Sequence, residues 1–189
     1  SLESYCSEKT VAYLLCSPNN PGGYVVSESD LRALASFLEK KNYWIISDEV
    51  YEYLSYKGAH LSLLELLSSL QDRFIHVNSF SKSFAMTGWR LGVAIGPEHI
   101  IEKMNLMLNT IVSCVPPFIQ YAGIEALEGD QSEIINMRRK YQKRRDIFVS
   151  GLNQVRGISC KMPRGAMYAF LNITQTNLSS DQFSQKCLH

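Results

Sequence analysis

Short apolar runs alternate along the chain with segments whose apolar residues recur at helical spacing. Residues 11–16, 43–46 and 74–78 are largely apolar over the length of a strand, and they predict three buried strands. Residues 31–38 carry leucine and alanine at helical spacing after an approximate capping box, so they predict a helix. Strand, helix and strand repeat with a period of roughly thirty residues, as in a βαβ unit. The pattern predicts an α/β fold with a mostly parallel sheet.

Two further helices are expected, within residues 61–70 and over residues 131–155. The second carries a dense run of arginine and lysine, from 138 to 145. Such a run is either a patch for a polyanion or a solvated helix face, and we favour the solvated face.

Polar residues follow each predicted strand. Asn20 lies in the turn after the first strand, Asp48 and Tyr51 follow the second, and Lys82 follows the third. Taken singly, each has a simpler interpretation as a loop, cap, packing or surface residue. Ligands bind at the carboxyl ends of the strands in open α/β sheets, and right-handed crossovers keep those ends on one side. We therefore expect these side chains at one edge of the sheet.

The segment around Lys82 suggests a specific chemistry. Ser79 and Ser81 precede the lysine, and Arg90 stands eight places after it. The planar guanidinium of an arginine can donate two parallel hydrogen bonds to a phosphate, and serine hydroxyls add neutral donors. A lysine reacts as an amine only when it is deprotonated. The segment suits a lysine that forms an imine with an aldehyde cofactor whose phosphate is held nearby.

These motifs resemble those of the fold-type I, class I/II aminotransferases that use pyridoxal 5'-phosphate, the aspartate aminotransferase-like family. SPNNPGG at residues 17–23 resembles the SPNNPTG turn of that family, with Gly22 in place of threonine. SDEVYE resembles its acid–tyrosine segment, SFSKSFAMTGWRLG its lysine signature, and PRGAMYAF at 163–170 the entry to its smaller domain. The resemblance implies a three-layer large domain, with helices on both faces of the sheet, followed by a smaller domain.

The resemblance also implies a role for each residue. Lys82 forms the Schiff base with the cofactor and then moves a proton as general base and general acid. Asp48 pairs with the pyridine nitrogen, and Tyr51 and Asn20 donate to the phenolic oxygen of the ring. The phosphate is held by hydroxyl and guanidinium donors: Ser79, Ser81 and Arg90. No metal is expected.

By the same resemblance, residues 1–150 are the second half of the cofactor-binding large domain and end in a long linking helix. Residues 151–189 are the start of the smaller domain. The family has a long segment before the first of these strands, and an arginine late in its smaller domain that binds the substrate carboxylate. No arginine follows Arg164. We therefore expect these 189 residues to be a fragment that is inactive by itself.

Composition narrows the remaining choices. A net charge of +1 gives no case for nucleic acid or an acidic membrane surface. The five cysteines are widely spaced, without metal-ligand spacing, as expected in a reducing compartment, and we expect a cytoplasmic protein. The family implies a homodimer that acts on amino acids and 2-oxo acids.

We therefore predict a pyridoxal-phosphate-dependent aminotransferase. Two alternatives stay open. Relatives with the same constellation are C–S lyases or decarboxylases, because the bond that breaks depends on how the substrate is held. The other alternative is an aminotransferase-like ligand-sensing domain of a regulator.

Overall fold

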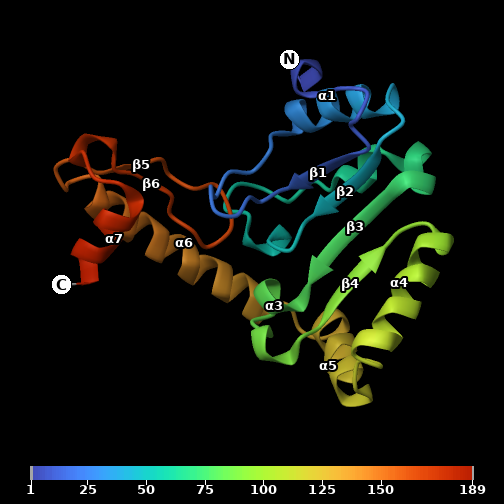
Figure 1. Ribbon diagram of the computed structural model, residues 1–189. Coiled ribbons are helices and arrows are strands. Elements are labelled where there is room, and N and C mark those ends of the chain that lie inside the picture. The colour runs from blue at the N-terminus through green and yellow to red at the C-terminus, as the bar shows by residue number, and fades with distance from the viewer. Residues whose placement is uncertain (1, 189) are drawn as a thin grey trace.

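Four strands form the main sheet of the computed structural model, which describes residues 2–188 apart from the side chains of residues 68 and 69. The strand order is β1-β2-β3-β4, with the first three strands parallel and β4 antiparallel to β3 (Figure 1). Their bounds are Ala12–Cys16 for β1, Trp44–Asp48 for β2, Phe74–Ser79 for β3 and Gly92–Ile95 for β4. The predicted α/β class with a mostly parallel sheet is confirmed.

Helices connect and extend this sheet. The α-helices are α1 Glu28–Glu39, α2 Leu63–Leu66, α3 Phe80–Ser83, α4 Glu98–Ile111, α5 Pro117–Glu128, α6 Ser132–Leu152 and α7 Ser180–Leu188. Short 3-10 turns are η1 Leu2–Tyr5, η2 Glu52–Leu54, η3 Ser68–Arg73, η4 Thr87–Trp89 and η5 Thr174–Thr176. A second, two-stranded antiparallel sheet pairs β5 Ser159–Cys160 with β6 Leu171–Asn172.

Helix α1 forms where the sequence predicts it. The Ser27 hydroxyl accepts a hydrogen bond from the Asp30 backbone N–H at 3.2 Å, which caps the first turn. The buried side of the helix consists of Leu31, Leu34, Ala35 and Leu38. This apolar side packs on one face of the sheet and forms the main core with buried strand residues: Leu15, Ile45 and Phe74.

The two faces of the sheet differ. The face that carries Leu15 and Ile45 is covered by α1 and α2. On the other face Leu14 remains 66% exposed, and α4 approaches it where the rings of Trp44 and His99 lie 6.1 Å apart. Only the first face is therefore closed by helices over its centre.

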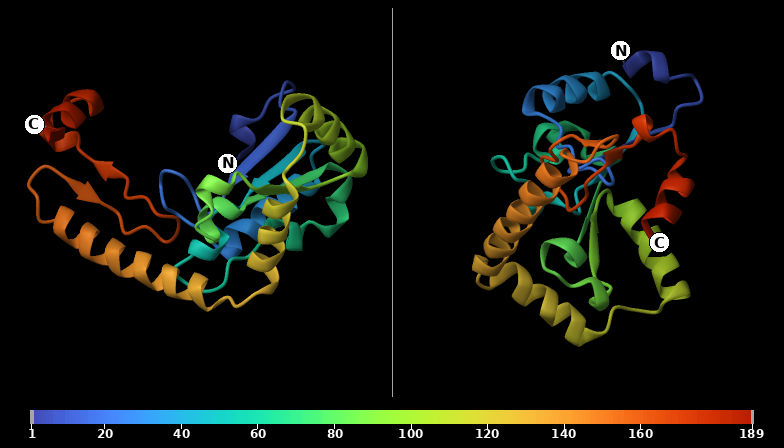
Figure 2. Two further views of the ribbon diagram at one scale, coloured as in Figure 1. Left: turned by 90° about the horizontal axis from the view of Figure 1, so that it is seen from below. Right: turned by 90° about the vertical axis from the view of Figure 1, so that its left-hand side faces the viewer.

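Helix α6 leads away from the main sheet to β5; the chain then returns toward the main sheet at residues 163–168 and runs back out to β6, which pairs with β5 (Figure 2). The return is fixed by backbone hydrogen bonds from Arg164 and Gly165 to the Gly23 carbonyl, at 2.7 and 2.9 Å. Gly23 has φ of 65°, and a Cβ at this position would lie 2.6 Å from Pro163 Cβ. Glycine is therefore needed where these two segments meet. Among residues 2–188, no helix combines the length and the apolar composition needed to cross a membrane.

Candidate active site

The carboxyl ends of β1, β2 and β3 lie at one edge of the sheet, and α3 begins directly at the end of β3 (Figure 1). Cys16 pairs in register with Asp48, and Asp48 pairs with Val77. Because side chains alternate along a strand, Ser79 points to the same face as Val77 and Asp48. Asp48 and Ser79 therefore share one face and one edge of the sheet.

Asn20 stands in the turn after β1, where the Ser17–Pro18 and Asn20–Pro21 peptide bonds are cis. The turn is closed by the Asn19 side chain, which accepts a hydrogen bond from the Gly22 N–H at 2.9 Å. Asn20 is exposed, and its side chain makes no hydrogen bond with the residues that the structure describes. The structure thus leaves the amide of Asn20 at the rim of this edge.

Asp48 is half-buried at the end of β2. Its carboxylate accepts a hydrogen bond from the Val50 N–H at 3.3 Å, and within residues 2–188 it forms no ion pair. An acid on the sheet face with no cationic partner in the described chain can accept a hydrogen bond from a protonated nitrogen of a ligand.

Tyr51 is buried beside Asp48. Its hydroxyl lies 2.5 Å from the hydroxyl of Tyr168, and the two rings meet edge to face at 79°. Burial raises the pKa of Tyr51, and the hydrogen bond with Tyr168 raises it further. The phenol therefore stays protonated at neutral pH and can donate a hydrogen bond.

Lys82 lies on α3, whose start is fixed by Ser79. The Ser79 hydroxyl accepts a hydrogen bond from the Ser81 N–H at 3.1 Å and donates one to the Leu91 carbonyl at 3.3 Å. The next residue, Ser83, is fully buried and donates to the Val50 carbonyl at 3.5 Å. This contact holds the lysine helix against the turn that carries Asp48 and Tyr51.

Arg90 ends the short η4 turn in a left-handed conformation, with φ of 55°. It is exposed, and its guanidinium donates to the Thr87 carbonyl at 2.9 Å. The neighbouring Leu91 carbonyl accepts from the Phe80 N–H at 3.2 Å, which keeps this segment beside the start of α3. In the described part of the chain no acidic side chain pairs with Arg90, so its remaining donors can bind an anion.

The structure thus gathers Asp48, Tyr51 and the Lys82 helix into one contiguous region, while Asn20 and Arg90 lie exposed at its border. Sequence reasoning assigned no role to three residues that contact this region: Cys16, Ser83 and Tyr168. The strand alternation and register could have identified Cys16 as the neighbour of Asp48. Tyr168 lies in the motif at residues 163–170, but nothing in that motif indicates the contact with Tyr51, because the contact depends on how the returning segment packs. Among residues 2–188 no His, Cys, Asp and Glu side chains are grouped as metal ligands.

Comparison with known proteins gives a consistent result. A family model described as aminotransferase class I and II matches residues 2–189. The chain is 41% identical over 186 residues to aromatic-amino-acid aminotransferase 2 of Thermococcus litoralis. This match covers 97% of this chain and 48% of the relative. The chain is also 40% identical over 189 residues to an aspartate aminotransferase of Pyrococcus abyssi, and this match covers 99% of this chain and 48% of the relative.

The fold is similar to that of solved aminotransferases. The crystal structure of an aromatic aminotransferase from Pyrococcus horikoshii OT3 superimposes with a TM-score of 0.92 at 39% identity. The match covers 99% of this chain and 50% of that chain. The chain spans about half the length of the curated relatives it matches.

Proposed function

The chain belongs to the class I and II aminotransferase family, and we propose that it is the lysine-bearing half of an enzyme that transfers an amino group between an amino acid and a 2-oxo acid. Aminotransferases of this family, aspartate aminotransferase among them, use pyridoxal 5'-phosphate. In this proposal residues 1–150 belong to the cofactor-binding domain and 151–189 to the smaller domain. The 189 residues alone would be inactive, since they span about half of their relatives.

One observation carries the proposal. The register of β1, β2 and β3 puts Asp48 and Ser79 on one face, and the Ser83 hydrogen bond holds the Lys82 helix beside them. An acid and an amine are thereby kept in one region without pairing with any other described side chain. That arrangement suits a ligand that presents a basic nitrogen and a carbonyl carbon.

The residues present fit pyridoxal phosphate by their chemistry. The half-buried carboxylate of Asp48 suits the ring nitrogen, and the donors of Tyr51 and Asn20 suit the phenolic oxygen. The phosphate would be bound by the hydroxyl and guanidinium donors near the end of β3: Ser79, Ser81 and Arg90. When bound, the cofactor supplies an aldehyde carbon for the amine and a ring that accepts electrons.

The side chains of this chain supply the remaining functions. The Lys82 amine would remove a proton from the substrate α-carbon as a general base. It would then deliver that proton to the aldehyde carbon of the cofactor as a general acid. Asp48 holds a proton on the ring nitrogen by its negative charge. Tyr51 would donate a hydrogen bond to the phenolic oxygen anion of the cofactor and is itself oriented by Tyr168.

We also propose the setting of this reaction. The partners are small amino and 2-oxo acids, with no nucleic acid or membrane, in keeping with the net charge of +1. The enzyme works as a homodimer, a proposal supported by the apolar side chains that α4 and α5 expose. The cytoplasm is favoured by the cysteines, which are free throughout residues 2–188.

The function is tested with the whole protein, using aspartate or an aromatic amino acid as donor and 2-oxoglutarate as acceptor. Lys82→Ala should lower the rate of amino transfer by roughly 10²–10⁴-fold, because the base is lost. Lys57→Ala changes an exposed lysine outside the site and should leave the rate unchanged.

Equal rates for wild type and Lys82→Ala would contradict the proposal. Release of a thiol or of carbon dioxide without amino transfer would instead identify a lyase or a decarboxylase built on the same site.

A further inference from the structure

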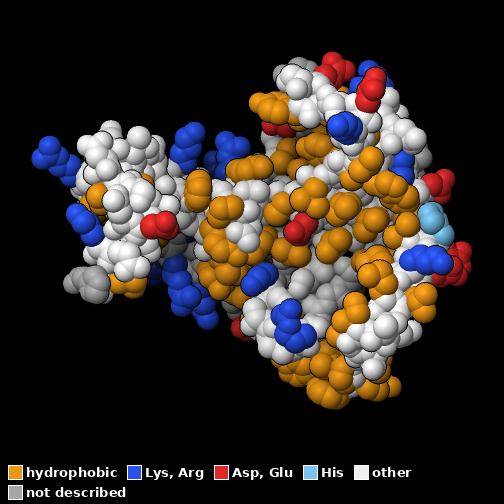
Figure 3. All heavy atoms as spheres, in the orientation of Figure 1, with side chains coloured by type: hydrophobic (Ala, Val, Ile, Leu, Met, Phe, Trp, Pro, Cys, Tyr) orange, Lys and Arg blue, Asp and Glu red, His pale blue; other side chains and the backbone are white. Residues whose placement is uncertain are grey.

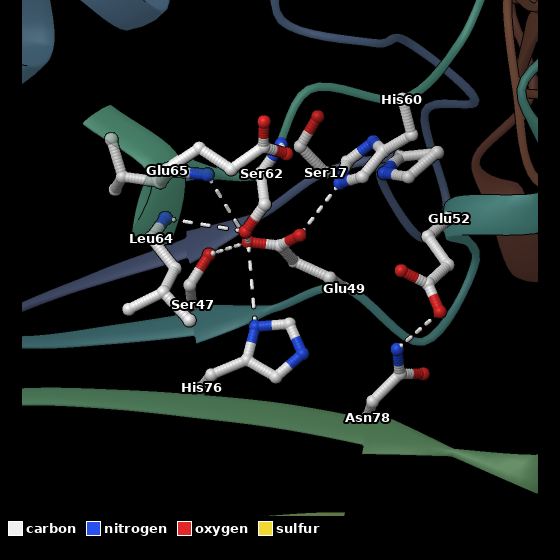
Figure 4. Close-up of polar contacts among 12 residues, drawn as sticks. Ser17, Ser47, Glu49, Glu52, His60, Ser62, Leu64, Glu65, His76 and Asn78 are labelled. Atoms are coloured by element: carbon white, nitrogen blue, oxygen red, sulfur yellow. Dashed lines mark hydrogen bonds and ion pairs between the residues drawn. The ribbon is translucent and has the colours of Figure 1, made fainter. Parts of the chain in front are cut away.

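Glu49 is a buried carboxylate for which the proposed reaction has no use. It stands between Asp48 and Tyr51 in the sequence, and it is only 1% exposed. Because side chains alternate, it points to the face opposite that of Asp48. There it lies among Ser47, His60, Ser62 and His76, and we name these five residues the Glu49 cluster (Figure 4).

The Glu49 carboxylate is bound from several elements. Its Oε1 accepts hydrogen bonds from the hydroxyls of Ser47 and Ser62 at 2.7 and 2.9 Å. Its Oε2 lies 2.7 Å from Nε2 of His60. On β3, Nδ1 of His76 lies 3.6 Å from Oε1, an ion-pair distance rather than a hydrogen bond. One carboxylate thus joins the end of β2, the segment before α2, and β3.

The same residue fixes the backbone of the turn. The Glu49 N–H donates to the Val77 carbonyl at 3.0 Å, and the Glu49 carbonyl accepts from the Glu52 N–H at 2.9 Å. Glu52 is itself held by a hydrogen bond from the Asn78 side chain at 2.6 Å. Asp48 and Tyr51 therefore stand on a turn whose position relative to β3 depends on Glu49.

Stability alone is a weak reason for such a cluster. A buried ion pair often stabilises a protein no more than apolar side chains of similar size, because both charges lose their hydration. A carboxylate held from three directions does restrict where its own backbone can lie. Because Glu49 follows Asp48 in the sequence and its side chain is held on the opposite face of the sheet, it can fix the orientation of Asp48.

We propose that Glu49 is a positioning residue, which acts with His60 and His76 to hold the Asp48–Tyr51 turn in the orientation that the cofactor site requires. The inference rests on the proposed function for what Asp48 and Tyr51 do. Its structural part, the electrostatic coupling between Glu49 and His76, does not depend on any cofactor.

The charges in the cluster support this role. Burial alone would raise the pKa of Glu49, but His60, His76 and Ser47 outweigh burial and hold that pKa well below its ordinary value. The Glu49 carboxylate raises the pKa of His76, against the opposing effect of burial. The nearby carboxyl groups of Glu52 and Asp48 raise it further.

These directions fix the pH range in which the cluster stabilises the fold. The pKa of Glu49 is lowered from 4.5, so its contribution is complete above about pH 4.5 and is lost as the pH falls further. The pKa of His76 is raised from 6.5, so its contribution is complete below about pH 6.5 and is lost as the pH rises through the folded-state value. Both contributions are complete together only between these two values.

The first test uses the whole protein without cofactor. Glu49→Gln keeps the shape of the side chain but removes its charge, so the pKa of His76 should fall, as followed by NMR of the imidazole. Glu65→Gln is the matched control. Glu65 accepts from the Ser62 N–H at 3.2 Å in a capping box, where glutamine serves equally well. An unchanged His76 pKa in Glu49→Gln would overturn the inference.

The second test uses the protein loaded with pyridoxal phosphate. Glu49→Gln should lower kcat about tenfold with KM within about twofold, because the turn is misplaced rather than the substrate contacts. The limb of the kcat–pH profile that follows His76 should move to lower pH by the shift seen in the NMR titration. A merely structural role would reduce the amount of folded enzyme without moving this profile.

A second variant covers the case in which Glu49→Gln does not fold. His76→Asn keeps an N–H near the position of Nδ1 but cannot titrate, so the same limb should disappear. A profile that superimposes on that of the wild type, in either variant, would overturn the inference. A wild type that binds no cofactor and transfers no amino group would contradict the proposed function, and the positioning role with it.

Discussion

The Tyr51–Tyr168 pair illustrates how single side chains far apart in the sequence build the site. The two residues are 117 positions apart, yet their hydroxyls lie 2.5 Å from each other. The sequence singles out Tyr51 because it follows a strand and an acid. It gives no comparable signal for Tyr168, because a long-range contact depends on how the returning segment packs at Gly23.

Tyr168→Phe should therefore change the site without removing any predicted residue. The pKa of Tyr51 should fall, since burial, the largest effect that raises it, remains but the hydrogen bond with Tyr168 is lost. The rate of amino transfer should fall about fivefold, the usual effect of one lost hydrogen bond of roughly 1 kcal/mol, and less than in Lys82→Ala. Ultraviolet titration of tyrosinate and kcat measure the two effects.

Tyr53→Phe is the control for this change. The Tyr53 ring packs against Phe84 at 5.6 Å, and its hydroxyl bonds to no other residue that the structure describes. Equal effects of the two substitutions would show that the Tyr51–Tyr168 contact has no special role.

At the scale of elements, the sequence predicts those whose signals are local. Helix α1 has its cap and its apolar side within its own residues, and the three parallel strands are continuous apolar runs. The helix predicted within residues 61–70 is instead split into α2 and η3, because Leu67 between them adopts a non-helical conformation, with φ of −117° and ψ of 35°. The sequence does not predict strand β4, since its four residues form a strand only by pairing with β3.

Ser27→Ala tests the origin of α1. It removes the hydroxyl that accepts from the Asp30 N–H, so the free energy of unfolding should fall by about 1 kcal/mol. Leu38→Ala, in the core contact of the same helix, should cost about 2–5 kcal/mol. Ser36→Ala changes an exposed serine within α1 and should cost little. Urea unfolding of the protein measures all three, and a Ser27→Ala variant as stable as Ser36→Ala would refute the cap.

At the scale of the whole molecule, apolar side chains gather on one surface over the sheet and on the helices at its lower border (Figure 3). Helix α4 buries none of its residues. The most exposed apolar side chains of α4 and α5 are Leu106, Met107, Ile111, Phe118 and Tyr121. The sequence predicts the family from three motifs at strand ends, and it predicts that the sheet has an uncovered apolar face or edge. It does not identify these exposed side chains of α4 and α5, because an apolar helix pattern does not say what covers it.

The 189-residue chain should therefore self-associate and bind a hydrophobic dye. Leu106 on α4 and Phe118 on α5 are 63% and 67% exposed, and replacing both by glutamine should reduce self-association and dye binding. Asn105→Gln, also on α4, should change neither. Sedimentation at several concentrations and dye fluorescence measure the outcome. A monomer at all concentrations without dye binding would contradict the prediction.

Identification of the lysine that binds pyridoxal phosphate tests the central claim most directly. The whole protein is incubated with the cofactor, reduced with borohydride, digested and analysed by mass spectrometry. The phosphopyridoxyl mass should appear on Lys82 and be absent from exposed lysines such as Lys57 and Lys103. Label spread over the exposed lysines, or a Lys82 peptide without label, would contradict the proposed site.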